Sequence, residues 1–236
     1  MMNDYICLDL ETSGLNPKID KIIEIGAVKV IHGEVAEEYC TLVNPYIQLG
    51  EKTKLLTGIT DKELKNAPGI EEVMSSLLEF LGDFPLLGHR ILFDYSFIKR
   101  VAVNQSMTFE KQGIDTLLIA RKHLNNLKSR NLGFLCHYFG IPIREHRALE
   151  DARATHELYQ KMCHLFFTAG MDKQTEFRKS DLVYKVKKES PITKQQKERL
   201  YELICKHKLV VDYQVEYLTK NEASRYTDKI LSKYGR

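Results

Sequence analysis

The sequence predicts an α/β fold, a mixed sheet flanked by helices, followed by a small C-terminal helical module. Short apolar and β-branched runs come first, at 5–8, 22–31 and 39–43. Helical spacing of apolar residues dominates from about residue 70 onward, and one brief apolar run, 85–88, interrupts it. Strands followed by helices, with a short interior strand between them, are typical of such a sheet.

The first three strands are expected to be antiparallel. The run 5–8 has the length and composition of a short buried strand, and 22–31 is rich in isoleucine and valine. His32, Gly33 and Glu34 join it to the next run as a hairpin turn, and Asn44-Pro45 ends the third strand. These segments predict a three-stranded antiparallel unit.

Helices are expected after residue 70. Apolar residues at Val73, Met74, Leu77 and Leu81 follow the i, i+3, i+4 spacing of a helix packed on one face. The same reasoning predicts further helices at 94–104, 116–126, 131–139 and 149–167.

The C-terminal part differs from the rest. We expect a body at 1–170, a polar, lysine-rich linker at 171–189 and a small basic helical module at 190–236. Thr193 and Thr219 are predicted to cap its two helices, and Thr219 to Glu222 has the form of a capping box. Two helices of this size form a marginal fold that must pack on itself, on the body or on a partner.

Composition limits the class of protein. The 236 residues are 43% hydrophobic and 28% charged, which is a globular mixture. No apolar run approaches the ~20 residues of a membrane span, so we expect a cytoplasmic protein without a membrane partner. The five cysteines include no CxxC pair, and we expect them to pack in the core.

Charge is distributed unevenly. Residues 1–170 carry 19 basic and 22 acidic side chains, whereas 171–236 carry 16 and 10. A basic tail on an acidic body could attract nucleic-acid phosphates. A solvated lysine-rich helical surface explains the asymmetry equally well.

An acidic pair closes the first strand. Residues i and i+2 of a strand share a face, so Asp9 and Glu11 should project side by side. Two carboxylates that close repel each other unless a cation lies between them. Oxygen ligands of this kind favour Mg²⁺ or Mn²⁺.

The motifs, taken in order, resemble the DEDDh exonucleases, the group of the bacterial proofreading (DnaQ-like, epsilon-type) subunits of DNA polymerase III. The resemblance covers roughly residues 4–168. It rests on five motifs: Asp9-x-Glu11-Thr12, the run 23–27, the run 56–60, His89-x4-Asp94 and His146-x4-Asp151. It implies a ribonuclease-H-like fold with a five-stranded mixed sheet and removal of nucleotides from 3′ ends.

The resemblance also implies a two-metal reaction with two Mg²⁺ or Mn²⁺ ions. On this interpretation Asp9 bridges the two ions, Glu11 and Asp151 hold the ion that carries the attacking water, and Asp94 serves the second ion. His146 is the general base, because an imidazole can accept a proton near neutral pH. Each of these residues taken singly could also be an ordinary surface or helix-end side chain.

Further residues are candidates for contacts with the substrate. Thr12 matches a position that binds the terminal nucleotide in the family, and Ile59 and Thr60 match positions that line its base and sugar. Turn and core packing is the alternative for these three. His89 could approach the substrate, but we favour a hydrogen-bonded interior histidine. Arg90 departs from the asparagine that many members carry, which bears on substrate preference.

The expected partner is a nucleic acid with a free, single-stranded 3′ end, with a separate polymerase or other replication or repair protein as a second possible partner. The sequence does not separate a DNA nuclease from an RNA-trimming enzyme. The alternative from another class is a non-catalytic nucleic-acid-binding or adaptor protein on the same fold. The complete set of five residues argues against it.

Overall fold

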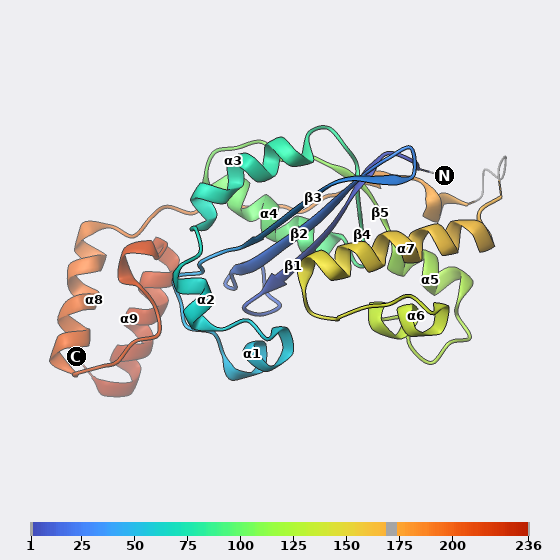
Figure 1. Ribbon diagram of the computed structural model, residues 1–236. Coiled ribbons are helices and arrows are strands. Elements are labelled where there is room, and N and C mark those ends of the chain that lie inside the picture. The colour runs from blue at the N-terminus through green and yellow to red at the C-terminus, as the bar shows by residue number, and fades with distance from the viewer. Residues whose placement is uncertain (1, 169–173, 236) are drawn as a thin grey trace.

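The computed structural model describes residues 2–168 and 174–235, and its element order confirms the α/β class (Figure 1). The strands are β1 Tyr5–Thr12, β2 Ile22–Ile31, β3 Glu34–Leu42, β4 Leu86–Gly88, β5 Gln112–Asp115 and β6 Ser180–Asp181. The helices are α1 Glu51–Thr57, α2 Asp61–Lys65, α3 Ile70–Leu81, α4 Leu92–Asn104, α5 Thr116–His123, α6 Leu132–Phe139, α7 Ala148–Phe166, α8 Lys194–Lys206 and α9 Lys220–Tyr234, with 3₁₀ turns at η1 Thr175–Phe177 and η2 Val215–Tyr217.

The sheet is mixed and has the order β3-β2-β1-β4-β5-β6. β1, β2 and β3 are antiparallel, as predicted, while β4 and β5 run parallel to β1. The expected five strands are extended by a sixth, because the two-residue β6 from the predicted linker pairs antiparallel with β5. The four residues of β5 include a glycine and show no alternating pattern, which is why the sequence did not reveal this strand.

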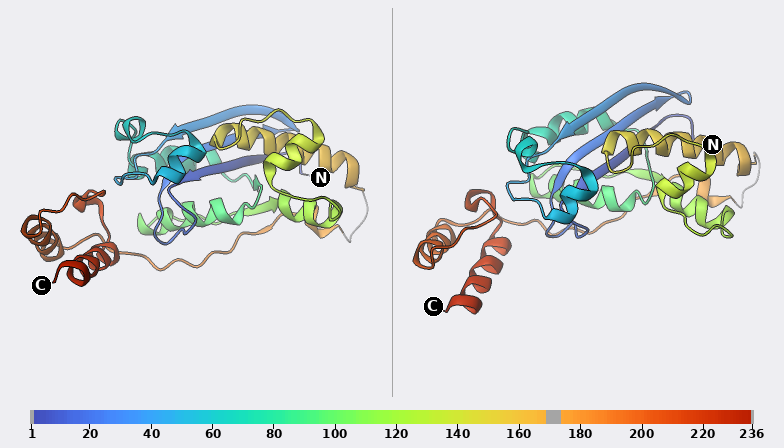
Figure 2. Two further views of the ribbon diagram at one scale, coloured as in Figure 1. Left: turned by 90° about the horizontal axis from the view of Figure 1, so that it is seen from below. Right: turned by 60° about the horizontal axis from the view of Figure 1, so that its bottom comes forward.

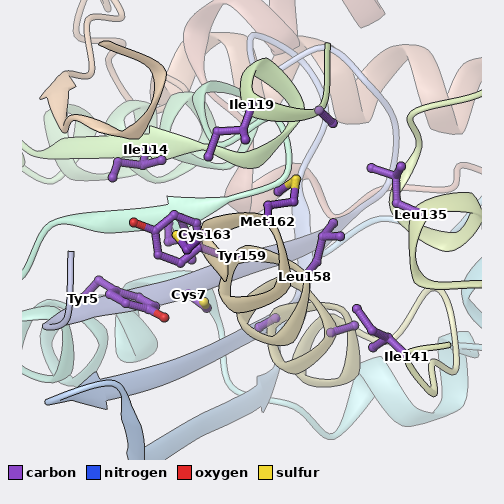
Figure 3. Packing of buried hydrophobic residues seen from close by; sticks show 14 of the residues in the cluster. Tyr5, Cys7, Ile114, Ile119, Leu135, Ile141, Leu158, Tyr159, Met162 and Cys163 are labelled. Atoms are coloured by element: carbon purple, nitrogen blue, oxygen red, sulfur yellow. The ribbon is translucent and has the colours of Figure 1, made fainter. Parts of the chain in front are cut away.

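Helices cover both faces of the sheet. Tyr5 and Cys7 of β1 face α5, α6 and α7, and Figure 3 shows this cluster with Leu158, Tyr159 and Met162 of α7 at its centre. The alternate residues of β1 and β2 face α3 and α4. β1 is therefore buried on both sides, and a side chain at its end lies between helices.

Two short helices were not predicted. Along the chain, α1 and α2 follow β3 and precede α3, and Figure 1 shows them below the strands. α2 begins with a capping box in which Thr60 accepts from the Glu63 amide and Glu63 binds back to the Thr60 amide. With only 7 and 5 residues, these helices are too short to show a helical period in the sequence.

The C-terminal helices pack on each other around their own apolar cluster, which includes Leu200, Leu203 and Ile230. Thr193 and Thr219 cap α8 and α9 as predicted, each within a capping box. Figure 2 shows both helices at one end of the molecule, with the preceding extended segment running along the body. The predicted boundary at 170/171 falls outside the described residues.

Two further findings concern composition. The prediction that the cysteines pack in the core is right for Cys7, Cys136 and Cys163, but Cys40 and Cys205 are exposed. Cys40 lies on β3 at the edge of the sheet, where one strand face is open to solvent. Within residues 2–168 and 174–235, no helix combines the length and apolar character needed to cross a membrane.

Candidate metal centre

The acidic pair lies on the face of the sheet that α7 covers. Asp9 and Glu11 alternate with Leu8 and Leu10, which belong to the cluster under α3 and α4. The pair therefore continues the row of Tyr5 and Cys7. Glu11 is only 8% exposed, so its charge must be compensated by a partner or by a proton.

Gly26 allows α7 to approach β2 closely. Gly26 pairs with Asp9 in the sheet, and a Cβ atom built on it would lie 2.1 Å from the backbone carbon of Ala148. Only glycine permits this approach. It brings the first turn of α7, and with it Asp151, alongside the end of β1.

A buried ion pair holds the start of α7 in place. Glu24 is 1% exposed and accepts from Arg147 through two guanidinium nitrogens, at 2.7 and 3.1 Å. Its second oxygen also accepts from the Ala148 amide at 2.9 Å. Glu24 and Gly26 lie in the motif run 23–27, but no individual role was predicted for them or for Arg147. A charged residue inside the apolar run of β2 was the signal available, since a buried carboxylate requires partners.

Glu11, His146 and Asp151 come together at this point. One potential ligand atom from each lies within 4.8 Å of the others. The His146 amide donates to Asp151 Oδ2 at 2.9 Å, whereas Asp151 Oδ1 is buried and has no hydrogen-bond partner. His146 has φ +68°, an uncommon conformation for a residue with a side chain, which the bonded turn before α7 maintains.

Asp94 joins the group from the other side of β1. It is in the first turn of α4 and 4% exposed, and its Oδ1 accepts from the Leu10 amide at 3.0 Å. This bond to the residue between Asp9 and Glu11 places Asp94 at the end of β1. Three separate segments thus bring four carboxyl groups and one imidazole to one end of the central strand.

The electrostatic consequence is mutual destabilisation of the charges. Burial and the carboxylates of Asp94 and Asp151 raise the pKa of Asp9 well above its ordinary value. Burial, followed by the charge of Asp151, raises the pKa of Glu11 to about 8. Burial raises the pKa of Asp151 to about 7, against the opposing effect of the His146 amide, and burial likewise raises the pKa of Asp94. Without a cation, part of the cluster is protonated at neutral pH.

Three of the predicted substrate contacts, Thr12, Ile59 and Thr60, have packing or turn roles in the structure. Thr12 lies at a register shift in the β1–β2 pairing, and its hydroxyl donates to the Gly14 carbonyl. Ile59 is 3% exposed in a small apolar cluster with Ile23, and Thr60 is the cap of α2. Packing and turn roles are thus visible for all three, and contact with a substrate stays a prediction.

His89 has the interior role that we favoured. Its Nδ1 is 2.9 Å from the Thr116 hydroxyl, and its Nε2 is 2.7 Å from the Arg130 carbonyl oxygen, so both ring nitrogens are used within the protein. Burial lowers its pKa, which keeps the ring neutral. Arg90, the next residue, is exposed with φ +78°. Asparagine adopts this left-handed conformation more easily than arginine.

Comparison with known proteins places the chain among nucleases. The family model described as Exonuclease (RNase_T) matches residues 6–159. The PolC-type DNA polymerase III of Thermotoga maritima is 38% identical over 177 residues, which are 74% of this chain and 13% of the polymerase. The corresponding protein of Clostridium perfringens is 37% identical over 157 residues, 66% of this chain and 11% of that protein. The chain thus spans about an eighth of the length of these relatives.

Solved structures share the fold. The nuclease domain of 3′hExo, a DEDDh family member bound to rAMP, aligns with a TM-score of 0.60 at 19% identity, over 75% of this chain and 96% of that domain. Exonuclease X in complex with 5′ overhanging duplex DNA aligns with a TM-score of 0.58 at 23% identity, over 70% of this chain and 95% of that protein. At these identities the match concerns the arrangement of the chain alone.

Proposed function

This chain belongs to the RNase_T exonuclease family, and from that premise we propose that it is a metal-dependent 3′-to-5′ exonuclease that releases nucleoside monophosphates. The expected resemblance to the DEDDh exonucleases is confirmed by the family match and by the PolC-type relatives. The observation that carries the proposed chemistry is the convergence of Glu11, His146 and Asp151, with Asp9 and Asp94 at the same strand end.

The residues fit divalent cations. Asp151 Oδ1 is a buried acceptor without a donor, which is costly unless a cation occupies its lone pairs. The elevated pKa values of Asp9 and Glu11 indicate the same deficit of positive charge. Carboxylate oxygens are the ligands that Mg²⁺ and Mn²⁺ prefer. We propose that Asp9, Glu11, Asp94 and Asp151 would hold two such ions.

Bound divalent ions would supply activation of a water molecule and stabilisation of the departing 3′ oxygen. The chain's own groups do the rest. His146 accepts the proton of the attacking water, and the bond from its amide to Asp151 keeps the imidazole beside the ligand set. The Glu24–Arg147 pair holds the start of α7, which carries Asp151 and directly follows the turn with His146, so the base keeps its position when substrate binds.

We propose a nucleic acid with a free 3′ end as the substrate and DNA as the first polymer to test. The PolC-type relatives are DNA polymerases, which favours DNA and a polymerase or repair partner. A solved neighbour is bound to rAMP, which keeps RNA as the second candidate. Thr12, Ile59 and Thr60 remain proposed contacts of the terminal nucleotide, whereas for His89, whose ring nitrogens are both bonded within the protein, we propose an interior role. A cytoplasmic location is part of the same proposal.

The test is release of mononucleotides from oligonucleotides labelled near the 3′ end, with Mg²⁺ or Mn²⁺ and with EDTA. Single-stranded DNA, duplex DNA with a mismatched end and RNA are compared at equal metal concentration. Metal-dependent release that Asp9→Ala abolishes supports the proposal. An Asp9→Ala protein as fast as the parent would contradict the ligand assignment.

The same assay distinguishes the alternative class. A non-catalytic adaptor binds the oligonucleotide but releases no nucleotide at any metal concentration. A base role for His146 is tested by the pH profile, because His146→Ala should lose the rising limb of rate against pH while binding of the oligonucleotide is retained.

A further inference from the structure

The C-terminal helices contact the body next to the loop that leaves the metal centre. This loop, residues 13–21, follows Thr12 and returns the chain to β2. Its base is closed by two hydrogen bonds between Ser13 and Lys21, at 2.8 and 2.9 Å, and further bonds between Asn16 and Asp20 make it compact. Because Ser13 and Lys21 are hydrogen-bonded to each other, the position of Lys21 affects the position of the backbone at Ser13 and Thr12.

The Lys21 side chain leaves this loop and binds the module. Its ammonium lies 2.7 Å from Glu222 Oε1, and the Glu222 side chain is only 5% exposed. The second oxygen of Glu222 accepts from the Thr219 amide at 2.8 Å, closing the capping box of α9. One buried carboxylate therefore joins the start of α9 to the loop beside the metal ligands.

A second set of contacts fixes the module on the chain between β3 and α1. The backbone amide of Gln48 donates to the Asp212 carbonyl at 2.7 Å, and the backbone amide of Gln214 donates to the Tyr46 carbonyl at 2.9 Å. The rings of Tyr46 and Tyr217 stack at 3.5 Å, nearly parallel. The same stretch leads into α1, whose Thr53 hydroxyl donates to the Ser13 carbonyl at 3.2 Å. Both routes from the module therefore end at the loop after Thr12.

A third contact comes through the linker. Arg100 of α4 binds Glu189 at 2.7 Å, with the two side chains 10% and 18% exposed. Glu189 also accepts from Asn221 of α9 at 3.2 Å. The module is thus held at three places, by two ion pairs and by a set of backbone hydrogen bonds with a stacked tyrosine pair. It is therefore a fixed part of the molecule, unlike an arm on a free tether.

We propose that Lys21 is a positioning residue: its pairing with Glu222 makes the C-terminal module a brace for loop 13–21, so that the module's docking supports binding of the 3′-terminal nucleotide at Thr12. The proposal rests on the proposed nuclease function for its kinetic consequence. The structural part of the proposal, that the module stabilises loop 13–21, does not depend on the identity of any substrate.

The test uses the full chain with Lys21→Met, Glu222→Gln and the double variant. Glutamine keeps the capping box, because its amide oxygen still accepts from Thr219, and removes only the charge that Lys21 needs. We expect each single variant to raise KM about threefold to tenfold with kcat changed less than about twofold. The double variant should be no worse than either single one, as for two residues of one interaction.

Matched controls separate a brace from general attraction to phosphates. Glu202→Gln makes the same change on the exposed surface of α8, and Lys18→Met removes an exposed charge from the same loop. Each Glu→Gln change removes one negative charge. The net charge of the chain becomes more positive, which by electrostatics alone would strengthen binding to phosphates and lower KM. A raised KM in Glu222→Gln but not in Glu202→Gln supports the brace. A raised KM in Lys21→Met with none in Glu222→Gln overturns it, since Lys21 would then act on the substrate directly.

A readout without substrate distinguishes the two proposals. Hydrogen exchange is measured by mass spectrometry on the metal-free full chain, for peptides covering loop 13–21 and α9. In Glu222→Gln both should exchange faster than in the parent, and in Glu202→Gln neither should. Faster exchange in a protein whose parent cleaves no nucleic acid supports the coupling while the nuclease proposal fails. Unchanged exchange in loop 13–21 overturns the brace.

Discussion

Asp9 illustrates how a single buried carboxylate can lower the stability of a fold while it serves the proposed metal site. Its pKa is raised by burial and by the carboxylates of Asp94 and Asp151, so its negative charge is unfavourable until a cation neutralises it. Residues that serve a site in this way commonly reduce stability in the free protein.

Replacing Asp9 should therefore separate stability from activity. We expect Asp9→Asn to melt at a higher temperature than the parent in EDTA, because a like charge is removed, and to gain less on addition of Mg²⁺. Nuclease activity should fall by at least about a hundredfold, since even residues that only orient metal ligands contribute about tenfold to a hundredfold. The exposed Asp83→Asn is the control. Equal Mg²⁺ stabilisation of Asp9→Asn and the parent would contradict a ligand role.

The dependence of stability on pH follows from Glu11 and Asp151. Unfolded carboxyl groups lose their protons near pH ~4, whereas the folded pKa values are about 8 and about 7. Between these limits the folded state binds more protons than the unfolded state, so the free energy of unfolding decreases as pH rises.

In EDTA we thus expect the melting temperature to fall steadily from about pH 5 to about pH 8, with a smaller fall in Mg²⁺ because the cation replaces the protons. Thermal unfolding followed by circular dichroism measures both series. In the double variant Glu11→Gln/Asp151→Asn, the melting temperature in EDTA should change less with pH. An EDTA series that rises over this interval would refute the assignment of these two pKa values.

At the level of elements, the decisive contact is between β2 and the start of α7. The backbones meet at Gly26 and Ala148, and the pair of Glu24 with Arg147 holds them together. This junction determines where Asp151 and His146 lie relative to β1. It contains none of the proposed ligands.

Gly26→Ala should therefore damage the site from outside it. The added methyl has no room against the Ala148 backbone, so α7 must move, at a cost of about 2 kcal/mol or more. We expect lower stability in urea and a large loss of metal-dependent activity. Gly50→Ala is the matched control, since no atom lies within 4 Å of its added carbon, and its stability should stay within about 0.5 kcal/mol of the parent.

At the level of the whole molecule, the C-terminal helices are docked beside the site, and the surface they cover includes Tyr46 and Ile47. Deleting residues 190–236 should raise KM more than it lowers kcat, because the ligands remain while the flanking loop loses its support. Steady-state kinetics on a labelled single-stranded oligonucleotide measure both constants.

A control for this deletion removes charge alone. Lys229→Gln/Lys233→Gln changes two exposed residues of α9 and leaves its contacts with the body intact. If this variant raises KM as much as the deletion does, the module acts mainly through phosphate attraction. Equal kinetics for the deletion and the parent would instead assign the module to docking on another protein.

The helices with long amphipathic faces and the caps at Thr193 and Thr219 were predictable, because periodicity and capping are local properties. β5, β6, α1 and α2 were not, because each is too short for a period, and β6 exists only through its partner strand. At the site, the ordered motifs singled out the four carboxylates and the imidazole that the structure brings to one end of β1. The supporting roles of Glu24, Gly26 and Arg147 did not follow from any local pattern.

The sequence by itself thus determined the family, the α/β class and the identity of the acidic residues, since strand alternation and motif order are written along the chain. Only the tertiary structure decided that α7 contacts β2 at a glycine, that Asp151 retains a free buried oxygen, and that Glu222 joins the last helix to the loop after Thr12. The physical reason is that the two contacts join residues 122 and 201 positions apart in the chain, and the third feature is the absence of a hydrogen-bond donor. Neither kind of feature leaves a pattern in the local sequence.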